Sequence, residues 1–236
     1  MTDTIFALSS GAPPAGIAVV RVSGSRARAA LESLAQRTPP PRQASLALLT
    51  DPQDGAPLDR ALILWLPGPG TVTGEDLVEL HCHGGRAVVA AVEAALGAMP
   101  GLRRAQAGEF TRRAFLNGRM DLNAVEGLSD LLAAETQQQR RAALMMAEGH
   151  FSRRVEGWRR DLLDLSAMAE AALDFSDEDD VPDAAIEQRI GASIAALAEG
   201  IGKALAAPSA ERLRDGIRVV LAGPPNAGKS TLLNAL

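Results

Sequence analysis

The chain has 236 residues, 47% of them hydrophobic, and a formal net charge of −5 at pH 7; this allows two domains with cores of their own and argues against nonspecific nucleic-acid binding over the whole surface. Its single cysteine excludes an internal disulfide framework and a multi-cysteine zinc site. No apolar run approaches the ~20 residues of a membrane span, and the N-terminus lacks the pattern of a signal peptide, so we expect a cytoplasmic protein without membrane segments.

The first half of the chain predicts mixed α and β structure. Short apolar runs separated by Pro- and Gly-rich turns predict strands, and the amphipathic stretches between them predict helices. The predicted strands are residues 4–8, 16–22, 45–49, 61–66 and 77–83, and the predicted helices are 25–36, 86–98 and 109–117. Gly118 is a suitable residue to close the last of these helices. We therefore expect an α+β domain over residues 1–119.

The second half predicts long helices. Hydrophobic residues recur at steps of three and four over residues 122–148, 155–172 and 186–205. Such helices cannot each bury an apolar face alone, so we expect part of an α-helical bundle domain over residues 120–213. The acidic segment 174–183 contains Pro182 and lacks the spacing of an EF-hand loop, which indicates an exposed turn between the second and third helices.

The last residues contain a complete phosphate-binding motif. Gly223 to Ser230 reads GPPNAGKS, which fits G-x-x-x-x-G-K-[ST], between an apolar run at 217–222 and a helix-like segment at 231–236. In such a loop, backbone N–H groups point at phosphate oxygens, Lys229 reaches the β- and γ-phosphates and the Ser230 hydroxyl lies on Mg²⁺. We expect residues 214–236 to begin an α/β P-loop domain. No second Mg²⁺-side aspartate follows, so this sequence should not hydrolyse nucleotide by itself.

Several motifs, in order along the chain, resemble the MnmE (TrmE) family of tRNA modification GTPases. They are Asp3-Thr4-Ile5, GIAVVRVSG at 16–24, TGEDLVELH at 73–81, Gly84-Gly85, GEFTRRAFLN at 108–117, Leu173-Asp174-Phe175 and the P-loop with Asn226. The P-loop is widely shared, whereas TGED…EL…HGG together with GEFT-R-AFLN is highly specific. Two positions depart from the family pattern: Cys82 stands where glycine is usual, and Val72 where an aromatic residue is usual.

The resemblance implies an architecture and an activity. It implies an N-terminal α+β domain that binds a tetrahydrofolate derivative (the 5,10-methylene or a formyl form) and makes a homodimer, then a helical domain with a Ras-like GTPase domain inserted in it. Family members act with an FAD-dependent partner, MnmG, to add a (carboxymethyl)aminomethyl group at C5 of the wobble uridine of certain tRNAs. GTP hydrolysis in this family uses Mg²⁺ and depends on K⁺.

The resemblance also implies the site residues. The folate contacts would be Arg21, Glu79 and Arg119. The GTP-binding residues would be Asn226, Ala227, Gly228, Lys229, Ser230 and Thr231, with Mg²⁺ at Ser230 and K⁺ at Asn226. No catalytic residue is assigned within this sequence.

The candidate folate residues have alternative interpretations. Arg21 lies in an otherwise apolar strand, where it either forms an internal salt bridge or holds a carboxylate or pterin edge of folate. Glu79, His81 and His83 should share one face of their strand and leave the intervening residues in the core. Two histidines and a carboxylate could ligate a metal, but no fourth ligand is evident, which favours pocket-lining roles. Arg119 is either a ligand contact or a solvated charge near a helix C-terminus.

The remaining arginines form two groups, one around the GEFT block and one along the predicted helices. Solvated helix faces are the favoured interpretation and a phosphate-binding track for tRNA the second one, because no aromatic residues are interleaved with them. They are Arg103, Arg104, Arg112 and Arg113, and Arg140, Arg141, Arg153, Arg154, Arg159 and Arg160. Two alternative functions for the whole chain are a folate-responsive binding scaffold without its own catalysis and an unrelated P-loop ATPase or kinase.

Overall fold

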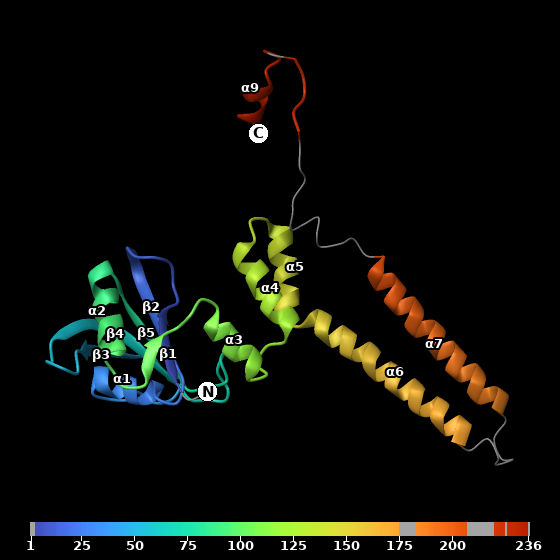
Figure 1. The fold of residues 1–236 in the computed structure, drawn as a ribbon, viewed down its shortest axis with the longest axis horizontal. Helices are drawn as coiled ribbons and strands as arrows, with labels where there is room; N and C mark the ends of the chain where they lie inside the picture. The colour runs from blue at the N-terminus through green and yellow to red at the C-terminus, as the bar shows by residue number, and fades with distance from the viewer. Residues whose placement is uncertain (1–2, 175–182, 207–219, 225, 236) are drawn as a thin grey trace. The chain divides into compact units, whose positions relative to one another are not determined.

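The structure is a computed structural model that describes residues 3–174, 183–206, 220–224 and 226–235. The chain divides into two compact units, Met1–Val125 and Glu126–Leu236. The first unit contains the sheet and three helices, and the second contains the long helices and the P-loop (Figure 1). The predicted order of an α+β part followed by a helical part is therefore confirmed.

The first unit is built on a six-stranded sheet with the order β3-β4-β5-β2-β1-β6. Four pairs of neighbouring strands are antiparallel, and β1 and β6 are parallel. The strands are β1 (Thr4–Leu8), β2 (Ala15–Ser23), β3 (Ser45–Thr50), β4 (Pro57–Leu66), β5 (Leu77–Gly84) and β6 (Leu102–Arg104). The five predicted strands are confirmed. The sixth was not predicted, because a three-residue strand with two arginines carries no periodic apolar signal.

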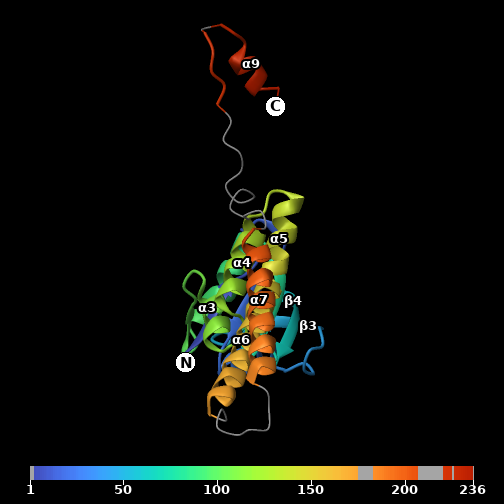
Figure 2. The same ribbon diagram turned by 90° about the vertical axis from the view of Figure 1, so that its right-hand side faces the viewer.

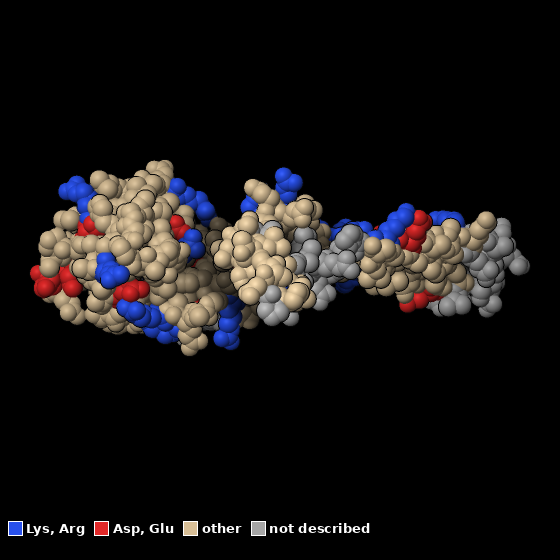
Figure 3. Space-filling model, turned by 90° about the horizontal axis from the view of Figure 1, so that it is seen from above, with Lys and Arg blue, Asp and Glu red and all other residues tan. Residues whose placement is uncertain are grey.

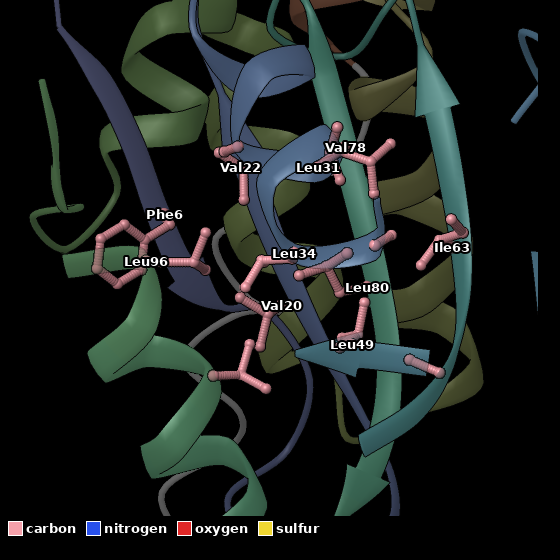
Figure 4. Close-up of a cluster of buried hydrophobic side chains, with 14 of the residues drawn as sticks. Phe6, Val20, Val22, Leu31, Leu34, Leu49, Ile63, Val78, Leu80 and Leu96 are labelled. Carbon is pink, nitrogen blue, oxygen red and sulfur yellow. The ribbon is translucent and has the colours of Figure 1, made fainter. Parts of the chain in front are cut away.

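Helices α1 (Ala27–Ala35) and α2 (Arg86–Gly97) cover one face of this sheet. Their apolar side chains, including Leu31, Leu34 and Leu96, pack against alternate residues of the central strands (Figure 4). On β5 the inward residues are Val78, Leu80 and Cys82, as the alternation predicts. Burial raises the pKa of the Cys82 thiol to about 12, and the negative charge of Asp59 adds to this effect, so the thiol is an inert core group.

The opposite face of the sheet is not covered by α1 or α2. It carries exposed apolar side chains, among them Ile17 on β2 and Leu62 on β4. At one end of this face Ser23 and Leu77 are buried, and hydrogen bonds join Ser23 to Thr73 and Glu75 of the loop before β5. The third helix of the unit, α3 (Glu109–Leu116), contacts the same loop. Gly118, with a φ of 65°, closes α3 as predicted.

The second unit is helical. Its helices are α4 (Leu122–Ala133), which begins in the first unit, α5 (Gln137–Ala147), α6 (His150–Asp174), α7 (Asp183–Leu205) and the short α9 (Lys229–Leu233). The single helix expected over 122–148 is wrong, because the chain leaves the helix after Ala133 and restarts at Thr136. The Thr136 hydroxyl accepts from the Gln139 N–H while the Gln139 side chain accepts from the Thr136 N–H, a capping box that begins α5.

The packing of these helices confirms the expected bundle contacts. A side chain on Gly127 of α4 would collide with the backbone of Ala147, so glycine lets α4 and α5 approach closely. Helices α6 and α7 lie side by side (Figures 1 and 2), with Gly200 against the Trp158 ring. Of the predicted acidic turn at 174–183, residues 175–182 lie outside the described residues. None of the described helices is both long and apolar enough to cross a membrane.

Candidate functional site

Arg21 and Glu79 face each other on neighbouring strands of the uncovered sheet face. The register of β2 and β5 pairs them directly, and Arg21 Nε donates to Glu79 Oε1 at 2.9 Å. The other carboxylate oxygen, Oε2, lies 3.1 Å from Nε2 of His81. The side chain of Arg21 is 37% exposed and that of Glu79 is 17% exposed. The residues Arg21, Glu79 and His81 thus form a polar row, the Arg21 row, that is open to solvent on one side.

The Arg21 row lies among apolar side chains. His81 pairs across the strands with Val19 on one side and Leu62 on the other, and Ile17 further along β2 is 62% exposed. A planar ligand that stacks on this face would meet aliphatic groups, a carboxylate that accepts hydrogen bonds and a guanidinium that donates them. The salt bridge that was one interpretation of Arg21 is present, and its exposure leaves it accessible to a ligand.

His83 is engaged elsewhere. Its backbone N–H donates to Asp59 Oδ2 at 2.7 Å, and its Nδ1 lies 2.7 Å from Asp59 Oδ1. Burial raises the pKa of Asp59, but these hydrogen bonds outweigh it and hold the pKa below its usual value. Among the described residues, no group of three or more His, Cys, Asp and Glu side chains could hold a metal ion. The pocket-lining roles of His81 and His83 stay a prediction.

Arg119, which follows α3, contacts the loop of residues 71–76 that contains the TGED motif. Its Nε donates to the Thr71 carbonyl at 3.1 Å, and the Asn117 side chain donates to the Thr73 carbonyl at 2.7 Å. Gly74 has a φ of 76°, and a Cβ there would press on both Asn117 and Arg119. The same loop meets Ser23, which lies two residues from Arg21 on the same face of β2. The structure thus brings Arg21 and Glu79 into contact. It places Arg119 against the loop that bonds to Ser23, on the same sheet face as Arg21.

Arg113 is the centre of a buried ionic cluster that the sequence analysis did not predict. Its side chain is 0% exposed. Its guanidinium donates to the Asp3 carbonyl and Oδ1, each at 3.0 Å, to both oxygens of Glu75 at 3.2 and 3.0 Å, and to Glu109 Oε1 at 3.3 Å. Arg103 bridges Asp3 and Glu109 from the other side. We call these five residues the Arg113 cluster.

The electrostatics of the Arg113 cluster favour the charged forms of Asp3, Arg103, Glu109 and Arg113. The hydrogen bonds from Arg103, against the effect of burial, hold the pKa of Glu109 at about 2. Hydrogen bonds from Arg103 also lower the pKa of Asp3. Burial lowers the pKa of Arg113, but its bonds to Glu75 and Glu109 outweigh burial and raise it. Nε of Arg113 is buried without a hydrogen-bond partner.

The cluster corrects one interpretation of the arginines. Arg113 was grouped with residues of a solvated face or a tRNA track, but a fully buried guanidinium can contact neither solvent nor phosphate. Arg103 and Arg104 are engaged with Asp3, Glu109 and Glu93. The spacing of Glu109 and Arg113, four residues apart on one predicted helix, was the available signal of an ion pair.

The six arginines that the sequence analysis grouped along these helices are exposed, and four of them have local partners. Arg154 lies over the Trp158 ring at 5.1 Å, and Arg159 pairs with Glu156 at 2.9 Å. On the face shown in Figure 3, the Lys and Arg side chains are dispersed over both units and interspersed with Asp and Glu. A track for tRNA along these helices stays a prediction.

The P-loop residues lie in the loop and first turn that the motif predicts. Asn226 and Gly228 have φ angles of 62° and 76°, and α9 begins at Lys229. The Lys229 ammonium donates to the carbonyls of Gly223 at 2.9 Å and Pro224 at 2.7 Å. Ser230 and Thr231 follow in the first turn of α9. Of the strand expected at 217–222, residues 217–219 lie outside the described residues, and 220–222 form no strand pairing.

Comparisons with known proteins agree with this architecture. Residues 4–119 match the family model described as the GTP-binding protein TrmE N-terminus, and residues 122–231 match the MnmE helical domain. Three relatives, each named tRNA modification GTPase MnmE, come from Novosphingobium aromaticivorans (64% identical over 100% of this chain and 56% of the relative), Erythrobacter litoralis (61%, over 99% and 54%) and a Methylobacterium species (58%, over 100% and 54%).

The chain therefore spans about half the length of the curated relatives it matches. The two family models together account for nearly all of its residues, in the same order as the two structural units. An unrelated P-loop ATPase would share neither match. The chain belongs to the MnmE (TrmE) family of tRNA modification GTPases.

Proposed function

We propose that the chain is the N-terminal part of a GTP-hydrolysing protein of tRNA modification. In the full-length protein, GTP hydrolysis accompanies the addition of a (carboxymethyl)aminomethyl group at C5 of the wobble uridine of certain tRNAs, together with an FAD-dependent MnmG-type partner. The names of the relatives and the P-loop motif support this proposal. We also propose that the protein is cytoplasmic and forms a homodimer through its first unit.

The first unit is proposed to bind a tetrahydrofolate derivative, the source of the one-carbon group. The half-exposed Arg21 row is the observation that carries this proposal. The pterin ring of folate presents N–H donors along one edge, which match a carboxylate acceptor such as Glu79. The ring faces suit the aliphatic side chains around the row, and the folate carboxylates suit a guanidinium. The acceptor, the donor and the apolar surroundings all lie on one sheet face.

Arg119 would provide a second cation for the same ligand. Its Nε is fixed on the Thr71 carbonyl. Val72, the next residue of that loop, is 57% exposed, and Phe115 in the last turn of α3 is also exposed. Arg119 thus contacts two segments, the loop and α3, that each carry an exposed apolar side chain, which suits an extended ligand with aromatic rings and a carboxylate.

The P-loop is proposed to bind GTP through Asn226, Ala227, Gly228, Lys229, Ser230 and Thr231. The Lys229 ammonium, which bonds to two carbonyls of its own loop, would exchange these for phosphate oxygens. The Ser230 hydroxyl and the Asn226 amide are oxygen donors of the kind that Mg²⁺ and K⁺ prefer. Bound Mg²⁺ would neutralise the phosphate charge, and Ser230 would hold it.

Titration calorimetry of the chain with 5-formyltetrahydrofolate tests the folate proposal. We expect a binding signal for the wild type and at least about tenfold weaker binding for Glu79→Gln, because the amide has one acceptor oxygen in place of two. The matched control is Arg104→Gln, an exposed arginine that pairs with Glu93 away from the row. No heat from the wild type, or equal affinity of Glu79→Gln, would overturn the assignment.

The nucleotide proposal is tested in the full-length protein. Lys229→Ala should abolish GTP hydrolysis and with it tRNA modification, because the loop loses its phosphate-binding charge. Unchanged modification of tRNA by this variant would instead support the alternative of a folate-responsive scaffold that needs no catalysis of its own.

A further inference from the structure

The geometry points to Arg113 as a positioning residue for the proposed folate site, acting through the loop of residues 71–76 on Arg119. This inference rests on the proposed function, because it concerns the same ligand. Arg113 itself is buried and does not touch the exposed row. Its effect on a ligand would be exerted by the backbone that it holds in place.

The first step is the contact between Arg113 and the loop. Nη1 of Arg113 donates to both carboxylate oxygens of Glu75, which is one residue beyond Gly74 in the TGED motif. Glu75 Oε2 also accepts from the Ser23 hydroxyl at 2.8 Å. The Glu75 side chain is therefore fixed between α3 and β2. Because charged hydrogen bonds in a buried site are strong, this residue anchors the loop.

The second step runs from the loop to Arg119. The Thr71 hydroxyl donates to the Glu75 carbonyl at 2.6 Å, which folds the loop on itself. The Thr71 carbonyl in turn accepts from Arg119 Nε at 3.1 Å. Arg119 thus lies at the end of a continuous chain of contacts that begins at Arg113.

The Arg21 row adjoins this chain of contacts at Ser23, the last β2 residue in the pairing with β5, which bonds to Glu75. Arg21 and Glu79 are held by the backbone pairing of β2 and β5, which extends from Ala15 to Ser23 without passing through the loop. A change at Arg113 should therefore weaken what Arg119 contributes to a ligand and leave what Glu79 contributes unaltered. This difference separates positioning from a general loss of structure.

The experiment measures the dissociation constant of 5-formyltetrahydrofolate for Arg113→Lys, Arg119→Ala and Glu79→Gln, alone and in pairs. Lysine keeps the charge of Arg113 but cannot span Asp3, Glu75 and Glu109 together. We expect Arg113→Lys to weaken binding about tenfold and Arg113→Lys/Arg119→Ala to bind no more weakly than Arg119→Ala alone. When Arg113→Lys is combined with Glu79→Gln, the fold-changes that the two substitutions cause in the dissociation constant should multiply.

The matched control is Arg103→Lys. Arg103 belongs to the Arg113 cluster through Asp3 and Glu109 but makes no ion pair with Glu75 in the described part of the chain. Its variant therefore disturbs the cluster without releasing the loop. We expect its affinity for folate to stay within about twofold of the wild type. Equal weakening by Arg103→Lys and Arg113→Lys, or independent effects of Arg113 and Arg119, would overturn the inference.

Amide hydrogen exchange tests whether Arg113 holds the loop even without a bound ligand. Arg113→Lys should speed exchange at residues 71–76 and 117–119 and leave β2 and β5 unchanged. If Arg113→Lys does not fold, Glu75→Gln takes its place with the same expectations. If the wild type does not bind folate, the proposed function fails, and unchanged protection of the loop in Arg113→Lys would overturn the positioning role as well.

Discussion

The Arg113 cluster and the Arg21 row both join an arginine to carboxylates across separate elements, yet they differ in closure. Arg113 has no exposed surface and contacts three carboxylates, two of which it shares with Arg103, whereas Arg21 is partly exposed and contacts one carboxylate. A closed cluster is out of reach of a ligand and fixes the fold. An open row exposes its hydrogen-bonding groups to a ligand. The same residue types therefore serve different purposes according to their access to water.

The largest expected effect is on stability. Arg113→Leu should lower the free energy of unfolding of the first unit by about 3–5 kcal/mol, because it leaves buried carboxylates without their partner. Urea unfolding followed by Trp65 fluorescence, in a Trp158→Phe background, measures this. For comparison, Arg21→Leu should lower the free energy of unfolding by less than about 1 kcal/mol, because the ion pair between Arg21 and Glu79 is partly hydrated. A similar cost for both would erase the distinction between closed and open sites.

A second, smaller effect is expected from acid. The pKa of Glu109 is about 2 in the folded protein and 4.5 for an ordinary glutamate. A lowered folded pKa stabilises the protein above the unfolded pKa, and that stability is lost as the pH falls. The contribution is about 3 kcal/mol at neutral pH and should disappear between about pH 5 and pH 2.

The pH dependence of the unfolding free energy checks this contribution. Glu109→Gln should show a shallower loss of stability over that range, and Arg103→Gln should flatten the profile in the same way, because Arg103 is the main cause of the lowered pKa. Parallel profiles for the wild type and Glu109→Gln would show that the cluster does not hold the carboxylate charged.

The smallest effect is expected for an ion pair at the surface. Arg104 pairs with Glu93 at 2.8 Å, but its side chain is 68% exposed. Arg104→Gln should change the unfolding free energy by less than about 0.5 kcal/mol, because hydration replaces the lost attraction. The same urea titration measures it. A cost above that of Arg21→Leu would mean that exposure does not rank these pairs.

The sheet could be predicted from the sequence because its signal is local. Alternation along β5 assigned Val78 and Leu80 to the core and Glu79 to the other face, as the structure shows. The division between α4 and α5 was missed, because the apolar stripe that begins at Leu122 was extended to residue 148 across the polar run 135–141. The signal of the new helix is the polar pair Thr136 and Gln139, which caps the start of α5 and which a hydrophobic pattern does not register.

Of the polar groups around the candidate site, the sequence pointed to Arg21 and Glu79 but not to the Arg113 cluster. The contact between Arg21 and Glu79 follows from two adjacent strands, and family resemblance named both residues. The Arg113 cluster joins Asp3, Glu75 and Glu109, which are far apart in the chain, so no local pattern brings them together. Burial of an arginine depends on such distant partners and is therefore visible only once the chain has folded.

The register between β2 and β5 constrains which lengths the chain can have at this point. Inserting one residue between Val19 and Arg21 would turn the side chains on one side of the insertion to the opposite face of the sheet. The Arg21 guanidinium would then face the core, or a core valine would face water. The register already shifts between Ala15 and Ile17, where an extra residue would leave the pairing beyond it intact. The fold should thus tolerate an insertion or deletion at that irregularity, whereas the same change a few residues later along β2 should disrupt it.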